Sequence, residues 1–390
     1  MTISFDLTDT QREITESVRQ MMRRFPDQYW AEKEDKHEFP HEFYQAFVEA
    51  GFLGAAIPQE YGGSGLGLME VALMLGEVSA SGGGLGAASA VHLSVFGMTP
   101  VVKYGSEAMK RKYLPKIVDG SLHVCFGVTE PDAGTDTTSI TTKAVRDGDH
   151  YVISGKKIWT SKAAESQKCL LLTRTTPREQ AARPSDGMTL FLVDLDPKAV
   201  TIRPIKKMAR NSVSSCEVFY DQLRVHESDR VGEEGKGFQY LLDGLNAERI
   251  LVSFEAAGLG RAAINRATEY AKNRKVFGRM IGQNQSIQFP LAESLAKLEA
   301  AHLMALKGAS LYDAGQSCGA EANMALYLAG AAAFEAADRA VQTHGGFGYA
   351  SEFHVERYFR ETRLWRLAPI SQNLILAYIA ERLLGLPKSY

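Results

Sequence analysis

The feature that most constrains this chain is its hydrophobic pattern, which changes twice along the sequence. Residues 9–119 repeat their apolar positions at helical spacing, residues 121–233 read as short strands, and residues 237–386 return to long, alanine-rich helical spacing. No helical period interrupts the central region, so its strands are expected to form an antiparallel barrel or sandwich rather than βαβ units. We therefore predict an α+β protein with three domains. These are an N-terminal helical domain at 1–120, a middle β domain at 121–235 and a C-terminal four-helix bundle at 236–390.

The central region is predicted to form strands because of its residue types and the turns between them. Its apolar runs are short and rich in β-branched and aromatic residues, and turn-forming pairs such as Asp147-Gly148 and Asp196-Pro197 separate them. The runs are YVISG, KCLLLTRT, MTLFLVDLD, VTIRPI and CEVFYDQLRV. At the start of the chain, by contrast, Thr8 is placed to cap a first helix.

Composition excludes several classes of protein. Of the 390 residues, 45% are hydrophobic and 23% are charged, a balance typical of globular chains rather than disordered ones. The net charge of −2 gives no electrostatic reason to expect nucleic acid as a partner. The cysteines are far apart and form no CxxC pair, so we expect reduced, buried thiols with no disulfide framework and no metal site. They are Cys125, Cys169, Cys216 and Cys318.

The first 18 residues, MTISFDLTDTQREITESV, carry four acidic residues and have neither a basic nor an apolar leader region. The chain holds no run of about 18 uninterrupted apolar residues, so no membrane span is expected. A cytoplasmic protein is the simplest interpretation, and a processed protein of the mitochondrial matrix would have similar features.

Two short motifs in the central region carry the most chemical information. They are FGVTEPDAGTD at residues 126–136 and GKKIWTS at residues 155–161. The first can offer alternating backbone groups and the Thr129 hydroxyl to a ligand edge, while Gly134 allows a close backbone approach. The second supplies Trp159, whose indole suits stacking against a planar ring. A flavin needs this combination of polar edge contacts and an apolar wall.

Together, in this order and between two helical regions, the motifs resemble the flavin-binding segments of the acyl-CoA dehydrogenase family. The resemblance runs essentially end to end, and it implies the helix–sheet–helix fold of that family with bound FAD. It also implies that Trp159 forms the wall of the flavin ring, that the Ser161 hydroxyl bonds flavin N5, and that Thr135 lies where substrate and flavin meet. The cofactor contacts implied in this domain are Phe126, Val128, Thr129, Gly134, Thr135, Trp159 and Ser161.

Further motifs lie in the C-terminal region, RKVFGRMIGQNQSIQ and QTHGGFGYA. An arginine suits a pyrophosphate, and paired glycines admit one at close range. In the family these positions contact the adenine-diphosphate half of a flavin that is held mainly by a neighbouring subunit. The resemblance therefore implies a homotetramer, built as a dimer of dimers. The contacts implied here are Arg274, Phe277, Gln285, Gln342, Gly345, Gly346, Ser371 and Gln372.

The catalytic base is expected at an alternative position. Most of the family carries a glutamate near the C-terminus, but the matching residue here is Ala368, and no residue from 366 to 372 is acidic. Some members carry the base on another helix, beside an arginine, and Glu248-Arg249 match that pattern. We therefore predict Glu248 as the base, with Glu255 as the second candidate seven residues along the same helical face. The alternative is that Glu248 is a solvated helix carboxylate.

In the same helix, the resemblance implies that Asn246 and Arg249 bind the pantetheine arm of the substrate and order the active site. A third feature of this helix, Gly258 to Ala263, matches a loose dinucleotide-binding pattern. No strand precedes it, so close helix packing explains its small residues better.

The resemblance implies FAD-dependent α,β-dehydrogenation of an acyl-CoA to a trans-2-enoyl-CoA. The α-proton would pass to Glu248 and the β-hydride to flavin N5, and an electron-transferring flavoprotein would accept the electrons. Because the usual base is replaced, two alternatives stay open. One is a flavin oxidase or monooxygenase on the same fold, and the other is a catalytically inactive protein that binds flavin or acyl-CoA.

Overall fold

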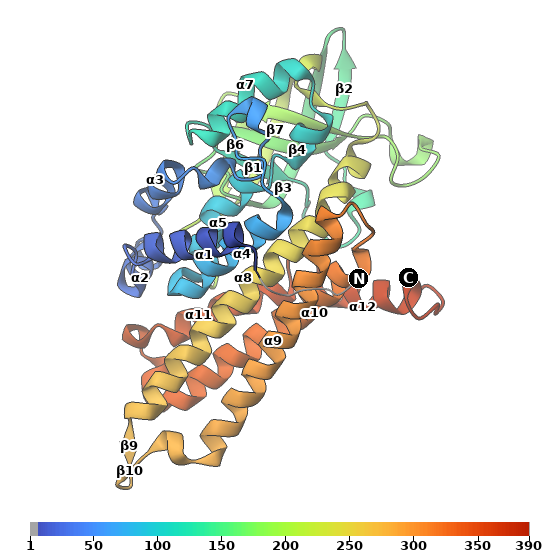
Figure 1. The fold of residues 1–390 in the computed structure, drawn as a ribbon. Helices are drawn as coiled ribbons and strands as arrows, with labels where there is room; N and C mark the ends of the chain where they lie inside the picture. Colours follow the sequence, from blue (N-terminus) through green and yellow to red (C-terminus); the bar gives the residue numbers. More distant parts are fainter. Residues whose placement is uncertain (1–6, 390) are drawn as a thin grey trace.

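The computed structural model describes residues 7–389 and has helices, then a sheet, then helices along the chain (Figure 1). The expectation that the chain starts without a leader region was drawn from residues 1–18, and residues 1–6 of that segment lie outside the described range. The first region is helical, as predicted, and Thr8 caps its first helix in a reciprocal box with Gln11. The helices are α1 (Asp9–Met22), α2 (Asp27–Lys36), α3 (His41–Glu49), α4 (Leu68–Val78), α5 (Gly84–Val95), α6 (Thr99–Tyr104) and α7 (Glu107–Val118).

Helices α4 and α5 are joined by a π-helical segment, Ser79–Gly83, and together they form the centre of the N-terminal domain. The stretch Leu68–Tyr104 is long and apolar enough to cross a membrane by length and composition alone. However, 78% of its most apolar window is buried inside the protein, as in the core helix of a soluble domain.

The central region forms one eight-stranded sheet in the order β6-β7-β3-β2-β4-β5-β8, with β1 paired to β4. Most neighbours are antiparallel, as predicted, but β4 pairs in parallel with β1 and β2. The β2–β3 hairpin intervenes before β4, and a parallel pair requires such a long connection. The strands are β1 (Val124–Gly127), β2 (Lys143–Asp147), β3 (His150–Ser161), β4 (Lys168–Arg174), β5 (Met188–Asp194), β6 (Val200–Pro204), β7 (Ser215–His226) and β8 (Arg230–Val231).

Strand β4 is buried along its whole length, which explains its uninterrupted apolar run. Leu170 and Leu172 face a core shared with α6 and α7. Cys169 and Leu171 face the opposite core, formed within the sheet. The β domain is therefore fixed to the helices on one face and closed on itself on the other.

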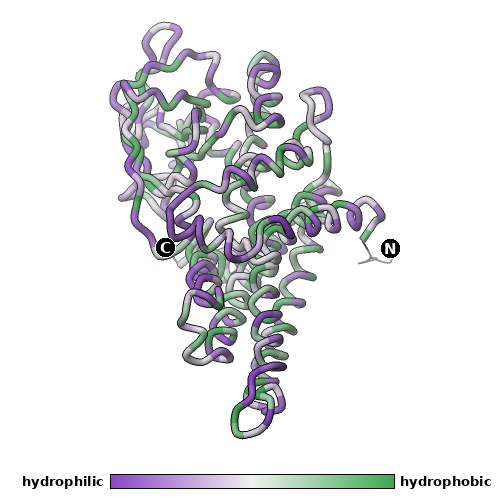
Figure 2. Tube along the Cα trace, turned by 90° about the vertical axis from the view of Figure 1, so that its left-hand side faces the viewer, coloured by the Kyte–Doolittle hydropathy of each residue, from purple (hydrophilic) through white to green (hydrophobic). Residues whose placement is uncertain are grey.

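The C-terminal region is dominated by the 37-residue helix α8, which runs from the β domain to the far end of the molecule (Figure 1). It contributes to the cores of both the N-terminal and C-terminal helices. A small hairpin at its end protrudes, and Figure 2 shows a hydrophobic segment at this tip. The elements are α8 (Gly237–Asn273), β9 (Lys275–Val276), β10 (Arg279–Met280), α9 (Gln285–Asp313), α10 (Gly319–His344), α11 (Val355–Thr362) and α12 (Gln372–Arg382).

The glycines of the loose dinucleotide pattern serve helix packing, as predicted. A Cβ on Gly258 would lie 2.3 Å from the carbonyl oxygen of Gly76 on α4, and one on Gly260 would lie 2.5 Å from Leu298 on α9. Both glycines sit within α8, so they permit close contact between helices rather than forming a phosphate-binding turn.

Candidate functional site

The two central motifs lie against each other at one end of the sheet. The amide of Ile158 donates to the carbonyl of Thr129 over 2.9 Å, and Lys157 Nζ donates to the carbonyl of Val128 over 2.9 Å. Lys157 Nζ also lies 2.9 Å from Glu130 Oε1, and both side chains are buried. A buried ion pair therefore connects the FGVTEPDAGTD segment to the GKKIWTS strand.

Burial disfavours the charged forms of both side chains, and the contact between their opposite charges favours them. Burial opposes the charge on Glu130, but Lys157 and the donors of Thr141 and Thr142 lower the pKa of Glu130 to about 2. Burial lowers the pKa of Lys157 to about 8, with Glu130 acting in the opposite direction. The pair remains ionised at neutral pH, so it keeps the two segments aligned.

Trp159 lies in a β-bulge near the end of β3, with a positive φ of 59°. A bulge turns a side chain away from its regular direction, and here the indole is 57% exposed. Such an exposed Trp beside hydroxyl groups is an open wall for a planar ligand. Thr129 and Ser161 are half-buried nearby in the chain, and Gly134 and Thr135 form an exposed turn with open space around Gly134. These residues fit an isoalloxazine ring.

The Ser161 hydroxyl has a partner that the sequence did not suggest. Arg210, in the loop between β6 and β7, donates from Nη2 to Ser161 Oγ over 3.1 Å and to Ser215 Oγ over 2.6 Å. Its Nη1 donates to Ser89 Oγ on α5 over 3.2 Å.

Glu248 lies in the first third of α8, within a cluster of charged side chains. Burial raises the pKa of Glu248 above its ordinary 4.5; the charges of His92 and Arg249 oppose this rise, and Glu255 adds to it. The side chain still keeps partial solvent exposure, so its carboxyl is withdrawn from water but can be reached. A carboxylate in this environment suits the role of a general base.

Glu255, the second candidate, is already engaged. His92 Nδ1 on α5 and Glu255 Oε1 are 2.6 Å apart, and both side chains are buried. Burial alone would lower the pKa of His92, but the charge of Glu255 and its hydrogen bond, with Glu248, raise it. Because His92 satisfies Glu255, this carboxylate is less available to a substrate than Glu248.

Arg249 faces a cavity of about 270 Å³ between α8, α10 and α12. It donates from Nη1 to Asn246 Oδ1 over 2.9 Å, so the two predicted substrate residues are in contact. Among the described residues, Arg249 Nε and Asn323 Oδ1 in this cavity have no hydrogen-bond partner. The cavity thus offers a donor and an acceptor to a polar ligand group.

The second set of predicted cofactor residues lies at the opposite end of α8. Arg274 and Glu248 are 26 residues apart, which at 1.5 Å per residue is roughly 39 Å along the helix. At the tip, the Arg274 guanidinium lies 5.6 Å from the Phe347 ring, and Phe277 is fully exposed. The set is exposed throughout, and the structure does not bring it to Trp159 within one chain. Its members are Arg274, Phe277, Gln285, Gln342, Gly345 and Gly346.

Ser371 and Gln372 start helix α12, and both have local partners. Ser371 Oγ accepts from the amide of Leu374 over 3.3 Å as the helix cap. Gln372 Oε1 accepts from Arg366 Nε over 3.0 Å. Their assignment as cofactor contacts stays a prediction.

Sequence reasoning missed four residues of this site. Glu130 and Lys157 carry opposite charges and lie one in each motif, which could have indicated an ion pair between the motifs. His92 and Arg210 had no comparable signal, because their partners are distant in sequence.

The fold and site define a flavin-dependent oxidoreductase of the three-domain helix–sheet–helix type. Three family models match in order: the acyl-CoA dehydrogenase N-terminal domain over residues 8–121, the middle domain over 125–223 and the C-terminal domain over 235–384. The chain belongs to the acyl-CoA dehydrogenase family, and it is an acyl-CoA dehydrogenase, a flavoprotein oxidoreductase.

Individual relatives agree with this assignment. The chain is 37% identical over 389 residues to the acyl-CoA dehydrogenase FadE12 of Mycobacterium tuberculosis (strain ATCC 25618 / H37Rv), with 99% of each chain covered. It resembles a solved glutaryl-coenzyme A dehydrogenase in complex with glutaryl-CoA, with a TM-score of 0.94, 28% identity and coverage of 99% and 98%. It also resembles the prolyl acyl carrier protein oxidase AnaB, with a TM-score of 0.92, 25% identity and coverage of 98% and 100%.

Proposed function

We propose that this acyl-CoA dehydrogenase binds FAD and converts an acyl-CoA to its trans-2-enoyl-CoA, with Glu248 as the base that removes the α-proton. One observation carries the proposal: Glu248 is a carboxylate on α8 whose withdrawal from water raises its pKa, while residues 366–372 contain no acidic side chain. When bound, FAD supplies the acceptor for the hydride that leaves the β-carbon.

The remaining site residues position the reactants. Trp159 provides the exposed wall for the ring, and Ser161 provides a hydroxyl toward it. Arg249 and Asn246 hold the polar part of the substrate near the cavity beside α12. His92 keeps Glu255 engaged, so that a single carboxylate is free to take the proton.

The proposal predicts the direction of a pH dependence. Glu248 must be deprotonated to act as a base, and its pKa lies above the ordinary 4.5 because of burial. The rate of flavin reduction by substrate should therefore rise with pH and reach its plateau at a higher pH than an exposed glutamate would give.

The direct test is Glu248→Gln, with Glu255→Gln as the matched variant on the same helix. We expect Glu248→Gln to keep bound flavin but to slow its bleaching by a panel of acyl-CoA thioesters by ~10²–10⁴-fold, the usual worth of a general base. Flavin reduction by Glu248→Gln at the wild-type rate would overturn the assignment. A comparable loss in Glu255→Gln, with flavin retained, would move the role to that residue.

The partners of the reaction belong to the same proposal. A single chain would need to span roughly 39 Å along α8 to use both sets of cofactor residues. We therefore infer that the tip residues contact a flavin held mainly by a neighbouring copy, within a homotetramer. We also infer that an electron-transferring flavoprotein reoxidises the cofactor, and that the protein is cytoplasmic.

An oxidase is the second candidate, and one observation favours it. AnaB, named as an oxidase, has the same fold, and this chain carries Ala368 and Pro369 where most of the family has its base. Reoxidation by air separates the two functions. Slow reaction of the reduced, product-bound protein with oxygen supports a dehydrogenase, whereas rapid reoxidation supports an oxidase.

A further inference from the structure

Arg210 is a charged residue whose contacts are unusual for an arginine withdrawn from water. Its two terminal nitrogens donate to the hydroxyls of Ser89, Ser161 and Ser215, at 3.2, 3.1 and 2.6 Å. Across residues 7–389, no carboxylate lies within ion-pair distance of it. The charge is therefore hydrogen-bonded but not neutralised by a direct partner.

Burying a charged guanidinium in this way lowers the stability of the fold. Burial is the largest influence on Arg210, and it lowers the pKa of the guanidinium. The charges of four carboxylates beyond ion-pair distance act in the opposite direction, those of Glu361, Glu255, Glu34 and Glu165. An arginine nevertheless stays protonated in proteins, so a full positive charge persists behind the hydroxyl of Ser161. Withdrawn charges are normally paired, and this one is bonded instead to a hydroxyl of the predicted flavin site.

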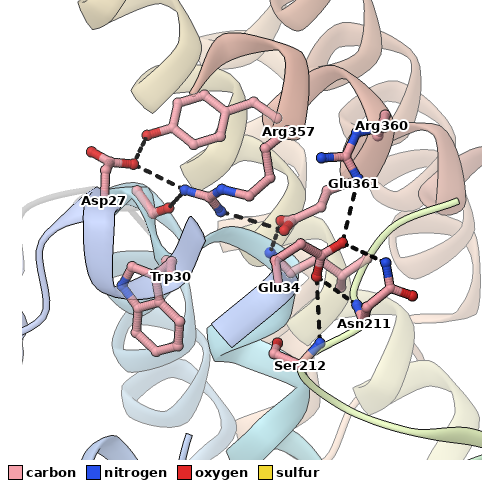
Figure 3. Close-up of polar contacts among 12 residues, drawn as sticks. Asp27, Trp30, Glu34, Asn211, Ser212, Arg357, Arg360 and Glu361 are labelled. Atoms are coloured by element: carbon pink, nitrogen blue, oxygen red, sulfur yellow. Dashed lines mark hydrogen bonds and ion pairs between the residues drawn. The ribbon is translucent and has the colours of Figure 1, made fainter. Parts of the chain in front are cut away.

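The loop that carries Arg210 is held rigidly in place. Glu34 on α2 accepts from the amide of Asn211 over 2.5 Å and from its side-chain Nδ2 over 2.9 Å, and Figure 3 shows this contact beside Ser212. Lys207 Nζ donates to the carbonyl of Arg210 over 2.6 Å. These bonds hold Arg210 at a positive φ of 61°, a conformation that a residue with a side chain rarely adopts.

The C-terminal domain also contributes contacts that hold the β6–β7 loop. Arg360 on α11 donates to the carbonyl of Met208 over 2.8 Å. It also lies 3.3 Å from Glu34, as Figure 3 shows. Three parts of the chain thus converge to fix one strained loop residue. Strain that is held by its surroundings in this way is typical of functional positions.

The contact with Ser161 has a defined direction. Because Arg210 can only donate, Ser161 Oγ is the acceptor, and its own proton is left to donate elsewhere. The family resemblance places the acceptor N5 of a flavin beside this hydroxyl. Reduction of a flavin by two electrons with uptake of one proton makes it one unit more negative, so a fixed positive charge behind Ser161 favours the reduced form.

We propose that Arg210 is a positioning residue that orients the Ser161 hydroxyl toward the flavin and, through its charge, makes the bound flavin a stronger oxidant. The inference rests on the proposed binding of FAD. It assigns to the β6–β7 loop a role in setting the redox potential, separate from the proton transfer assigned to Glu248.

The test is the midpoint potential of bound FAD in wild type, Arg210→Met and Arg210→Lys. We expect Arg210→Met to shift the equilibrium between reduced and oxidised FAD at least tenfold toward the oxidised form, a fall of ~30 mV for a two-electron couple. Arg210→Lys keeps the charge and should lose less than half of this shift. A Met variant at the wild-type potential, or a Lys variant as low as Met, would overturn the proposal.

Arg174→Met is the matched control. Arg174 is also buried, lacks an ion pair in the described part of the chain, and donates to the carbonyls of Ile140, Asp186 and Pro184. It ends strand β4, where it pairs with Lys143, and its side-chain hydrogen bonds go to loop carbonyls and not to Ser161 or Trp159. Its replacement should lower thermal stability and leave the potential unchanged. An equal shift in this control would assign the effect to general destabilisation and contradict the proposal.

A double-mutant cycle with Ser161→Ala tests the route of action. If Arg210 acts partly through the hydroxyl, Arg210→Met should shift the potential less in the Ser161→Ala background than in wild type. Equal shifts would contradict the orienting role. The cycle also separates this inference from the proposed function. Failure of the wild-type protein to bind FAD would end both, whereas bound FAD with an unchanged potential in Arg210→Met would end this inference alone.

Discussion

At the scale of single residues, the protein withdraws from water a cation that adjoins the candidate site. Lys162 is the next residue after Ser161 and is completely buried. Its Nζ donates to the carbonyl of Ala90 and to Ser94 Oγ, both at 3.1 Å, and lies 4.4 Å from the ring of Tyr44. Burial lowers its pKa to about 7, against a smaller opposing influence of Glu165. Lys162 therefore destabilises the fold whenever it must be charged.

This shift gives a pH-dependent prediction for stability. Between pH 7 and 10.5 the unfolded chain binds a proton at Lys162 that the folded chain does not, so stability rises with pH across this window. Below pH 7 the penalty is complete, at most about 5 kcal/mol because one pKa unit is worth ~1.4 kcal/mol. Lys162→Met should remove this rise. Urea unfolding at pH 7 and pH 9.5 checks it, and equal pH slopes in the two proteins would contradict it.

Local sequence patterns could indicate candidate site residues, but they could not indicate contacts between distant segments. Trp159 and the Glu248-Arg249 pair were predicted as site residues from local patterns. In the structure the indole of Trp159 is exposed, and Glu248 and Arg249 are half-buried. The hydrogen bond from Asn211 to Glu34 joins residues 177 positions apart, so no local sequence pattern could indicate it. Contacts of this kind depend on the tertiary fold, which single-residue preferences do not specify.

At the scale of elements, the hydrophobic periodicity predicted whether a segment forms a helix or strands, but not which strands pair with one another. The apolar runs became strands, and Asp147-Gly148 became the β2–β3 turn, with Gly148 at a φ of 65°. The parallel pairing of β1 with β4 could not be predicted, because register depends on which faces are buried after the domain closes on its helices. The π-helical segment between α4 and α5 was likewise hidden in an apolar, glycine-rich run.

Helix packing at Gly258 gives the prediction at this scale. Alanine there would place its Cβ against the Gly76 carbonyl, so α4 and α8 must separate. We expect Gly258→Ala to reduce the free energy of unfolding by ~1–3 kcal/mol, the usual cost of overpacking. Gly244→Ala in the same helix meets only Phe96 at 3.5 Å, and it should stabilise the protein by ~1 kcal/mol through helix propensity. Urea titration of both variants decides, and equal effects would contradict the packing argument.

At the scale of the whole molecule, the two groups of predicted cofactor residues lie toward opposite ends of one long helix. The tip exposes Phe277 fully and Tyr349 at 90%, and large exposed aromatic side chains of this kind are typical of an interface. The predicted ring contacts and Glu248 lie at the Trp159 end, while Arg274 and the paired glycines lie at the tip. If one flavin uses both ends, it must lie between two copies of the chain.

Subunit complementation tests this arrangement. Trp159→Ala should lose the ring wall, and Arg274→Glu should repel a pyrophosphate, so each variant alone should purify with little FAD. Co-expression with two affinity tags makes mixed assemblies, in which one kind of site combines the intact ring end of the Arg274 variant with the intact tip of the Trp159 variant. If the chains pair at random through a two-fold interface, about half of the pairs are mixed, and one of the two sites in each mixed pair has both intact halves. FAD should therefore return to about a quarter of all sites. Because neither chain has both halves, no recovery in the doubly tagged fraction would show that a single chain binds its own flavin.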